Sequence, residues 1–138
     1  QLNDRIKKKE LGMKKGKIKR FTDLSAWRKG HKVVINIYKI TKSFPEEEKF
    51  NLVSQMRRAA VSITSNIAEG FSKRSYADKA NFYSCSLGSL TELQNQMLIA
   101  RDLGYLPKSG FNGLAKKTVE LHKIINGLIK RSREIHNS

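Results

Sequence analysis

The sequence has 138 residues, which is enough for one domain with its own hydrophobic core and too few for two. Apolar residues make up 38% and charged residues 29%, and this ordinary composition excludes a disordered chain and a membrane-embedded one. The 28 Lys and Arg residues outnumber the 12 Asp and Glu residues, and the net charge of +16 favours nucleic acid as a partner, with an anionic membrane surface or simple solubility as the alternatives.

Residues 1–20 form the most basic segment, with nine Lys or Arg residues against Asp4 and Glu10. The segment has no sustained apolar stripe, so it predicts a basic flexible arm ahead of a helical-bundle domain over residues 21–138. Removing the arm's charge of +7 from the total of +16 leaves +9 on that domain, which is therefore basic in its own right. The arm's candidate nucleic-acid-binding side chains are Lys14, Lys15, Lys17, Lys19 and Arg20.

The cellular compartment is predicted from three further features. No run approaches the ~20 apolar residues that a membrane span needs, and the basic start lacks the apolar stretch of a signal peptide. A single cysteine, Cys85, excludes an internal disulfide and fits a reducing compartment. We therefore expect a cytoplasmic protein. Met13, which Lys14 follows, would suit an initiator, with residues 1–12 as upstream sequence.

The first predicted helix begins between Thr22 and Ser25 and ends at about Ser43. Phe44-Pro45 terminates it, because the residue before a proline is pushed out of the helical region. Its apolar face is predicted from residues at heptad spacing, widened by three neighbours. These residues are Leu24, Trp27, Val34, Tyr38 and Thr41, with Val33, Ile37 and Ile40.

The second predicted helix runs from Glu46 to about Phe71. Pro45 suits the entry to a helix, and the glutamates at 46–48 favour the positive amino-terminal end of its dipole. At 100° per residue, one face is apolar and is expected to form the core. That face consists of Leu52, Met56, Ala59, Ala60, Ile63 and Ile67.

The third predicted helix spans about residues 76–103 and stops at Gly104, a residue that suits the position after a helix end. The fourth runs over about residues 109–135, and its inner stripe is Leu114, Leu121, Ile125 and Leu128. No segment alternates with period two, so no sheet is expected. Short connections between long helices predict an all-α, antiparallel up-down-up-down four-helix bundle.

The first and fourth helices each carry a basic row opposite the apolar face. Glu120 can pair with Lys116 or Lys123 at helical spacing, which stabilises a helix by only ~0.2–0.5 kcal/mol per pair. The rows are either an ordinary solvated face or a surface that tracks phosphates. Their candidate binding residues are Arg28, Lys32 and Lys39 on the first helix and Lys116, Lys123, Lys130 and Arg133 on the fourth.

The second and third helices are poor in charge between Gln55 and Gly70 and between Ala80 and Gly104. A helix in a monomeric bundle normally covers its outer half with charged residues. Small residues at outward positions let another backbone approach, so we expect self-association into a closed assembly, with an unusually bland surface as the alternative. The expected outward residues are Val61, Thr64, Ala68, Ser84, Cys85 and Gly88.

A polar row flanks the core face of the second helix. Its first and last charged members, Arg58 and Glu69, are ~16 Å apart along the axis at 1.5 Å per residue, too far to pair with each other. The row is interpreted as an inter-helix hydrogen-bond network that fixes the packing register; the alternative is a lined channel or anion site at an assembly axis. It consists of Gln55, Arg58, Ser62, Asn66 and Glu69.

Nothing in the sequence points to catalysis. The three histidines, His31, His122 and His136, lack the i, i+3 or i, i+4 pairing that places two metal ligands on one helix face. Phosphate-loop and nucleophile-elbow patterns are absent, as is the Glu-x-x-His spacing of a di-iron bundle. We expect no enzyme activity, no metal and no cofactor.

The longest distinctive run is QMRRAAVSITSNIAEG over residues 55–70. With Phe21-x-x-Leu24-x-x-Trp27, Phe44-Pro45 and the stretch LGSLTEL over residues 87–93, it resembles the bacterial four-helix-bundle proteins named after intervening sequences in 23S ribosomal RNA genes. The resemblance covers about residues 21–132. It implies a homopentameric barrel of four-helix protomers with a positive surface. A related branch, the accessory variability determinant of diversity-generating retroelements, binds nucleic acid and assists a reverse transcriptase.

Charge, missing motifs and resemblance together predict a non-catalytic, oligomeric protein that binds RNA or DNA. A reverse transcriptase is a candidate partner, to which this chain would be an accessory factor. The alternative is a structural or adaptor oligomer whose positive charge meets an acidic protein partner. The sequence does not choose between RNA and DNA.

Overall fold

Four long helices make up the computed structural model, which describes residues 18–138. Two short 3₁₀ turns in the same stretch precede the first and second helices. No strand occurs in this part of the chain, so the predicted all-α class is confirmed. In chain order the elements are η1 (Phe21–Asp23), α2 (Ser25–Thr41), η2 (Glu46–Glu48), α3 (Leu52–Ser72), α4 (Tyr76–Asp102) and α5 (Lys108–His136).

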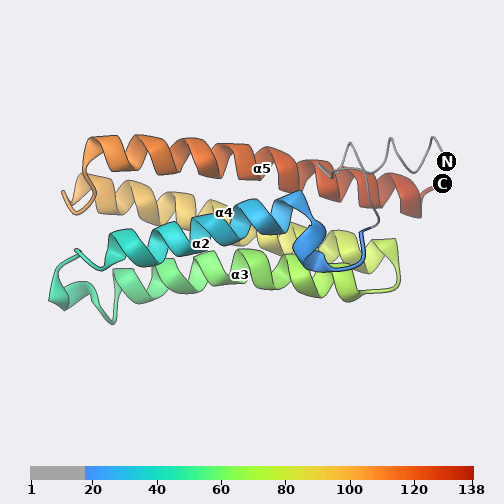
Figure 1. Ribbon diagram of the computed structural model, residues 1–138, viewed down its shortest axis with the longest axis horizontal. Helices are drawn as coiled ribbons and strands as arrows, with labels where there is room; N and C mark the ends of the chain where they lie inside the picture. Colours follow the sequence, from blue (N-terminus) through green and yellow to red (C-terminus); the bar gives the residue numbers. More distant parts are fainter. Residues whose placement is uncertain (1–17) are drawn as a thin grey trace.

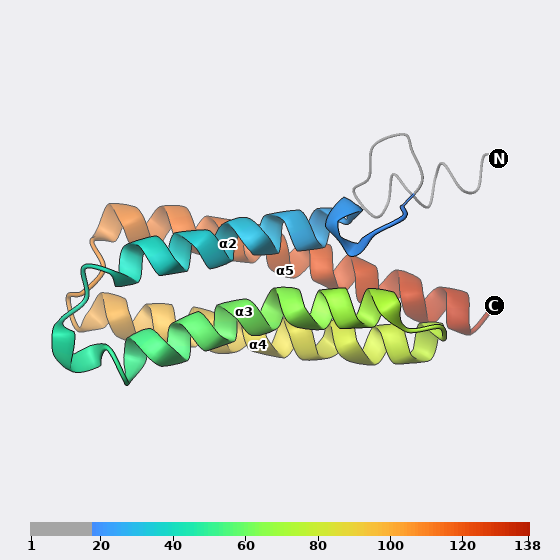
Figure 2. The same ribbon diagram turned by 60° about the horizontal axis from the view of Figure 1, so that its bottom comes forward.

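Successive helices run in opposite directions, which gives the predicted up-down-up-down order (Figure 1). The α2–α3 and α4–α5 connections share one end of the bundle, and the α3–α4 connection lies at the other. Turned by 60°, the molecule shows α2 and α5 on one side and α3 and α4 on the other (Figure 2). Each helix therefore packs against two neighbours and leaves an outer face.

The core is apolar and consists of the inward faces of all four helices. Every core residue predicted for α3 is buried, and so are the four inner residues predicted for α5. On α2 the prediction is right for most positions, but Tyr38 is 39% exposed and lies on the flank of the helix. The buried residues here are Val33, Val34, Ile37 and Thr41 of the helix, together with Leu24 just before it.

The second long helix begins at Leu52, six residues later than predicted. The glutamates at 46–48 form the separate turn η2. The backbone of Asn51 is not helical, so the turn and α3 are separate elements. Tertiary contacts hold this connection across the end of the bundle. Phe44 is buried against the ring of Tyr105, and the Tyr105 hydroxyl donates to the Glu48 carboxylate at 2.9 Å. This hydrogen bond raises the pKa of Tyr105.

Each end of α4 has a residue that favours the boundary of a helix, a cap at the start and a glycine after the end. The Ser75 hydroxyl accepts the backbone N–H of Asp78 at 3.1 Å, which caps the first turn. The helix ends at Asp102, one residue before the predicted limit, and Gly104 follows with a φ of 80°. Glycine adopts this left-handed conformation without the steric cost that a Cβ would bring.

Helices α3 and α4 pack tightly against each other at Gly70. A Cβ added there would lie 2.8 Å from Cε1 of Tyr83 and 3.0 Å from Cβ of Phe82. The Tyr83 ring is almost fully buried, so it has little room to move aside. Nearby, the buried Ser86 hydroxyl donates to the backbone carbonyl of Ile63 at 2.8 Å, and this bond ties the two helices together.

Gly70→Ala is expected to destabilise the protein by about 1–3 kcal/mol, because overpacking in a rigid core outweighs the better helix propensity of alanine. The matched control is Gly127→Ala on α5, where an added Cβ meets no atom within 4 Å. That variant should gain up to ~1 kcal/mol from propensity alone. Urea unfolding of both variants measures the difference. Equal stability of Gly70→Ala and the parent chain would show that the α3–α4 contact can relax.

Candidate nucleic-acid interface

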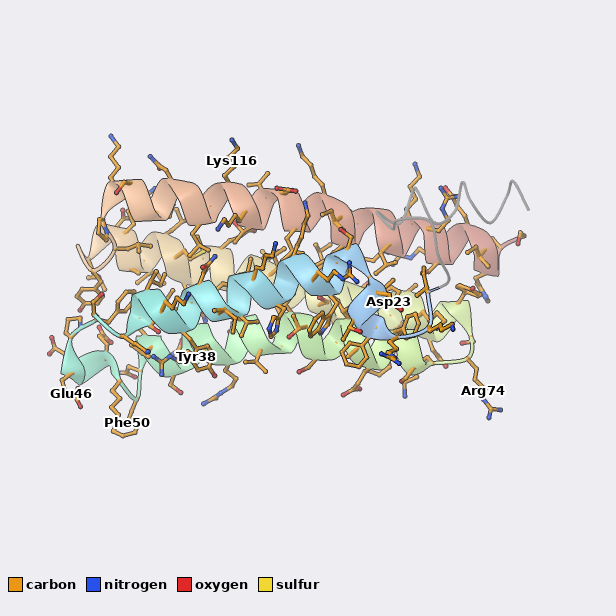
Figure 3. The ribbon with its side chains drawn as sticks, viewed as in Figure 1. Asp23, Tyr38, Glu46, Phe50, Arg74 and Lys116 are labelled. Carbon is orange, nitrogen blue, oxygen red and sulfur yellow. The ribbon has the colours of Figure 1, made fainter. Side chains whose placement is uncertain are left out.

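Helix α5 presents a row of ammonium groups to solvent. Lys116, Lys123 and Lys130 are exposed, and Lys116 points directly away from the bundle, among other nitrogen-tipped side chains on the same edge (Figure 3). Their spacing of seven residues separates neighbours by ~10 Å along the axis. None of the three forms a salt bridge with another described residue, although the charge of Lys116 contributes to lowering the pKa of Glu120. They are therefore free to contact phosphates.

The basic row on α2 contains one tethered and two free side chains. Nε of Arg28 donates to the backbone carbonyl of Thr22 at 2.8 Å, and its Nη2 lies 3.8 Å from the Asp23 carboxylate. Lys32 and Lys39 are exposed and form no ion pair within the described chain. Arg28 thus serves the local fold as well as the surface charge.

Residues 18–20 of the predicted arm pack onto the start of the bundle. Ile18 is half-buried against the core. The backbone N–H groups of Lys19 and Arg20 donate to the Asp23 carboxylate at 3.0 and 3.1 Å, and these bonds lower the pKa of Asp23. The side chains of Lys19 and Arg20 remain exposed. The other candidates on the arm, Lys14, Lys15 and Lys17, lie outside the described residues.

Glu120 joins α5 to α2. Its ion pair is with Lys29, which the sequence did not indicate, while the charge of Lys116 in the same helix also favours the Glu120 carboxylate. The hydrogen bond from Lys29 lowers the pKa of Glu120. The sequence alone could not identify this partner, because it lies 91 positions away and depends on which helices are neighbours. Because the salt bridge of Glu120 is with Lys29, Lys116 and Lys123 stay exposed on the outer face without a salt bridge to it.

The carboxyl-terminal part of α5 borders a shallow hollow of about 500 Å³. Lys130 and Arg133 line it, so two predicted binding residues face one depression. Arg133 also donates to the Ser84 hydroxyl of α4 at 3.5 Å. The remaining lining residues are Asn126, Ile129, Glu134 and Asn137.

The polar row of α3 divides into an inner and an outer part. Ser62 shares a hydrogen bond of 2.8 Å with Ser89 of α4, and the Asn66 amide donates to the Ser62 carbonyl at 2.8 Å. These two residues belong to a polar link between helices. Gln55, Arg58 and Glu69 are exposed instead. Within the described chain, Arg58 bonds only to Ser54 of its own helix, and Glu69 forms no ion pair.

The outer surface of α3 and α4 combines apolar side chains with small polar ones. Val61, Leu98 and Ile99 are 39%, 42% and 42% exposed, although the last two lay outside the set predicted from the sequence. Cys85 and Gly88 are exposed as predicted, whereas Ala68 and Ser84 are half-buried. A groove of about 790 Å³ runs along α3. Its lining includes Tyr38, Phe50, Arg58, Val61, Ser65 and Glu69.

Thr64 does not face outward, so this part of the prediction is wrong. It is only 9% exposed and packs toward α2, where its Cγ2 would lie 3.0 Å from a Cβ placed on Gly30. The hydroxyl is satisfied by the Val61 carbonyl at 3.1 Å. The apolar face of α3 is therefore wider than the helical wheel indicated, because α2 covers its flank.

Residues 18–138, which the structure describes, contain no cluster of metal-ligating side chains. No three His, Cys, Asp or Glu side chains in that range lie close enough together to hold a metal ion. None of the helices there has the length and apolar character needed to cross a membrane. His31 stacks on Trp27, an interaction that the sequence analysis missed, although their i, i+4 spacing could have indicated it.

Comparison with known proteins places this bundle in a described group. A family model for the 23S rRNA-intervening sequence protein matches residues 22–127, which is more than half of the chain. A crystal structure of a protein of unknown function from the S23 ribosomal protein family of Bacteroides thetaiotaomicron is similar in fold, with a TM-score of 0.71 and 23% identity. The match covers 76% of this chain and 95% of that one. No curated protein matches the chain.

Proposed function

The chain belongs to the 23S rRNA-intervening sequence protein family, and on this premise we propose that it is a non-catalytic, oligomeric protein that binds RNA or DNA. The phosphate backbone is met by the basic outer faces of α2 and α5 together with the basic segment at residues 1–20. Binding of this kind depends on charge and reads no sequence.

One observation carries the proposal, namely the separation of charge between the two sides of the bundle. Lys32, Lys39, Lys116, Lys123 and Lys130 are all exposed and are not neutralised by ion pairs within the described chain. A surface that served only solubility would mix both signs, as most protein surfaces do. Rows of a single sign instead attract a polyanion and raise its association rate.

The other side of the bundle supports the oligomeric part of the proposal. Along α3 and α4 the exposed residues include the apolar Val61, Leu98 and Ile99 and the small Cys85 and Gly88, beside charged ones such as Arg58 and Glu69. The groove over Val61 offers a surface for a second protomer. We infer a closed ring, and the homopentameric barrel implied by the family resemblance is the form we propose. Such a ring turns α3 and α4 toward the subunit contacts and leaves α2 and α5 outside, where the charges lie.

More specifically, we propose that the protein acts as an accessory factor to a reverse transcriptase. A charged ring would hold an RNA template near the enzyme. The alternative, an adaptor for an acidic protein, uses the same basic faces. Co-purification separates the two, because an adaptor recovers a protein partner that nuclease treatment does not release.

Salt titration of RNA and DNA binding tests the proposal directly. Labelled single strands and duplexes should bind tightly at about 50 mM salt, and log affinity should fall by about 0.7–0.9 per phosphate contact for each tenfold rise in salt. Fluorescence anisotropy measures the affinity. Absence of binding to either nucleic acid at low salt would contradict the proposal, and binding without salt dependence would contradict the role of the basic faces.

A further inference from the structure

An aromatic ladder lies at the start of α2, beside the basic row. The imidazole of His31 stacks on the indole of Trp27, with ring centroids 4.7 Å apart and an interplanar angle of 14°. Phe21 meets the same indole edge-on at 5.5 Å and 68°. The turn η1 brings Phe21 back onto the helix, because the Asp23 carboxylate accepts the backbone N–H groups of Lys19 and Arg20.

Core packing accounts only for the central ring of this ladder. Trp27 is half-buried against the core, but His31 is exposed and Phe21 is 37% exposed. One helical turn after His31, Ile35 is 41% exposed on the same flank. Aromatic and apolar side chains on this flank thus extend from the core to the solvent. Burial in the core does not explain why the exposed ones are aromatic or apolar.

Cations alternate with the rings along the helix. Arg28 directly follows Trp27, and Lys32 directly follows His31. Successive residues are 100° apart around a helix, so each ring is followed by a cation one position further round, and the two pairs are one turn apart. Arg28 is held there by the Thr22 carbonyl, whereas Lys32 is exposed. Stacking surfaces beside a line of positive charge are the elements of single-strand binding sites, in which the charges track the backbone and the bases stack on the rings.

We propose that the Trp27–His31 ladder is a stacking site for unpaired bases of a single-stranded nucleic acid. Arg28 and Lys32 hold the phosphates on either side of the stacked base. Every base has a flat face, so the site tolerates any sequence and selects single strands over duplexes, in which the bases are already stacked. This inference rests on the proposed nucleic-acid binding and names its substrate class.

The test uses Trp27 as its probe, because it is the only tryptophan in the chain. The intact protein is titrated with oligo(U) and oligo(dT), with an abasic strand of the same length and charge, and with a duplex. The strands that carry bases should quench the Trp27 fluorescence and bind about 5- to 10-fold more tightly than the abasic strand. The abasic strand and the duplex should bind with little quenching.

His31→Ala should abolish the advantage of base-bearing strands, while His136→Ala, an exposed histidine at the end of α5, should keep it. Circular dichroism verifies that both variants are folded. Equal affinity for base-bearing and abasic strands would overturn the stacking site but leave phosphate binding intact. An advantage that His31→Ala retains would overturn the assignment to this ladder. No binding of any strand at low salt would instead overturn the proposed function, and the stacking site with it.

Discussion

Replacing Lys116, Lys123 and Lys130 together by glutamine is expected to weaken nucleic-acid binding about 10²- to 10³-fold at ~0.1 M salt. The three ammonium groups are exposed on the outer face of α5 and form no ion pair in the described chain. Three lost phosphate contacts remove about 2–3 decades of affinity between 1 M and 0.1 M salt, and the salt slope becomes shallower by the same amount. Anisotropy titrations at several salt concentrations measure both quantities.

The matched control removes three positive charges elsewhere. Lys42, Lys49 and Arg74 are exposed near the helix connections, and Arg74 points away from the end of the bundle (Figure 3). Their replacement by glutamine gives the same net charge as the first variant, but it leaves the α5 row intact. We expect it to keep most of the affinity. Equal losses in the two variants would show that net charge, and not the outer face of α5, governs binding.

Val61→Lys is expected to dissociate the proposed ring into monomers. Val61 is 39% exposed in the protomer and lines the groove on α3, so a lysine there is solvated in the monomer. In a ring contact the same ammonium would be buried without a partner, and the effective penalty is on the order of several kcal/mol for each interface. Sedimentation at micromolar concentration should therefore show the protomer mass.

Val119→Lys is the control for this substitution. Val119 is 51% exposed on α5, away from α3, so the same added charge should leave the assembly intact. Both variants should unfold within about 0.5 kcal/mol of the parent protomer, because both sites are on the surface. If the parent chain is itself monomeric, the proposed ring is wrong. If Val61→Lys keeps the full mass, the contact lies on another face.

Predictions from the sequence were correct where a single local rule decides the structure. Apolar residues repeat with the helical period, and burial of that stripe leaves few arrangements for four long helices with short connections. The predicted core of α3 and the inner stripe of α5 are buried for this reason. Gly104 at the end of α4 was also predicted correctly, since the left-handed conformation there favours glycine.

Errors arose where contacts distant in sequence competed with a local rule. The glutamates at 46–48 suit a helix start, but the contacts of Phe44 and Glu48 with Tyr105 hold them in a separate turn. Thr64 lies at the edge of the helical wheel and became buried because α2 covers it. The sequence also did not indicate the salt bridge of Glu120 with Lys29 on α2.

In the candidate binding surface, too, some features follow from the sequence alone and others from contacts between helices. The sequence by itself determined that Lys116, Lys123 and Lys130 lie on one helix face opposite the apolar stripe, because the helical period fixes both. Only the tertiary structure decided which cations are free, since the Lys29–Glu120 pair depends on the packing of α5 against α2. It also decided that Phe21 packs against Trp27, because the turn held by Asp23 sets the path of the chain there.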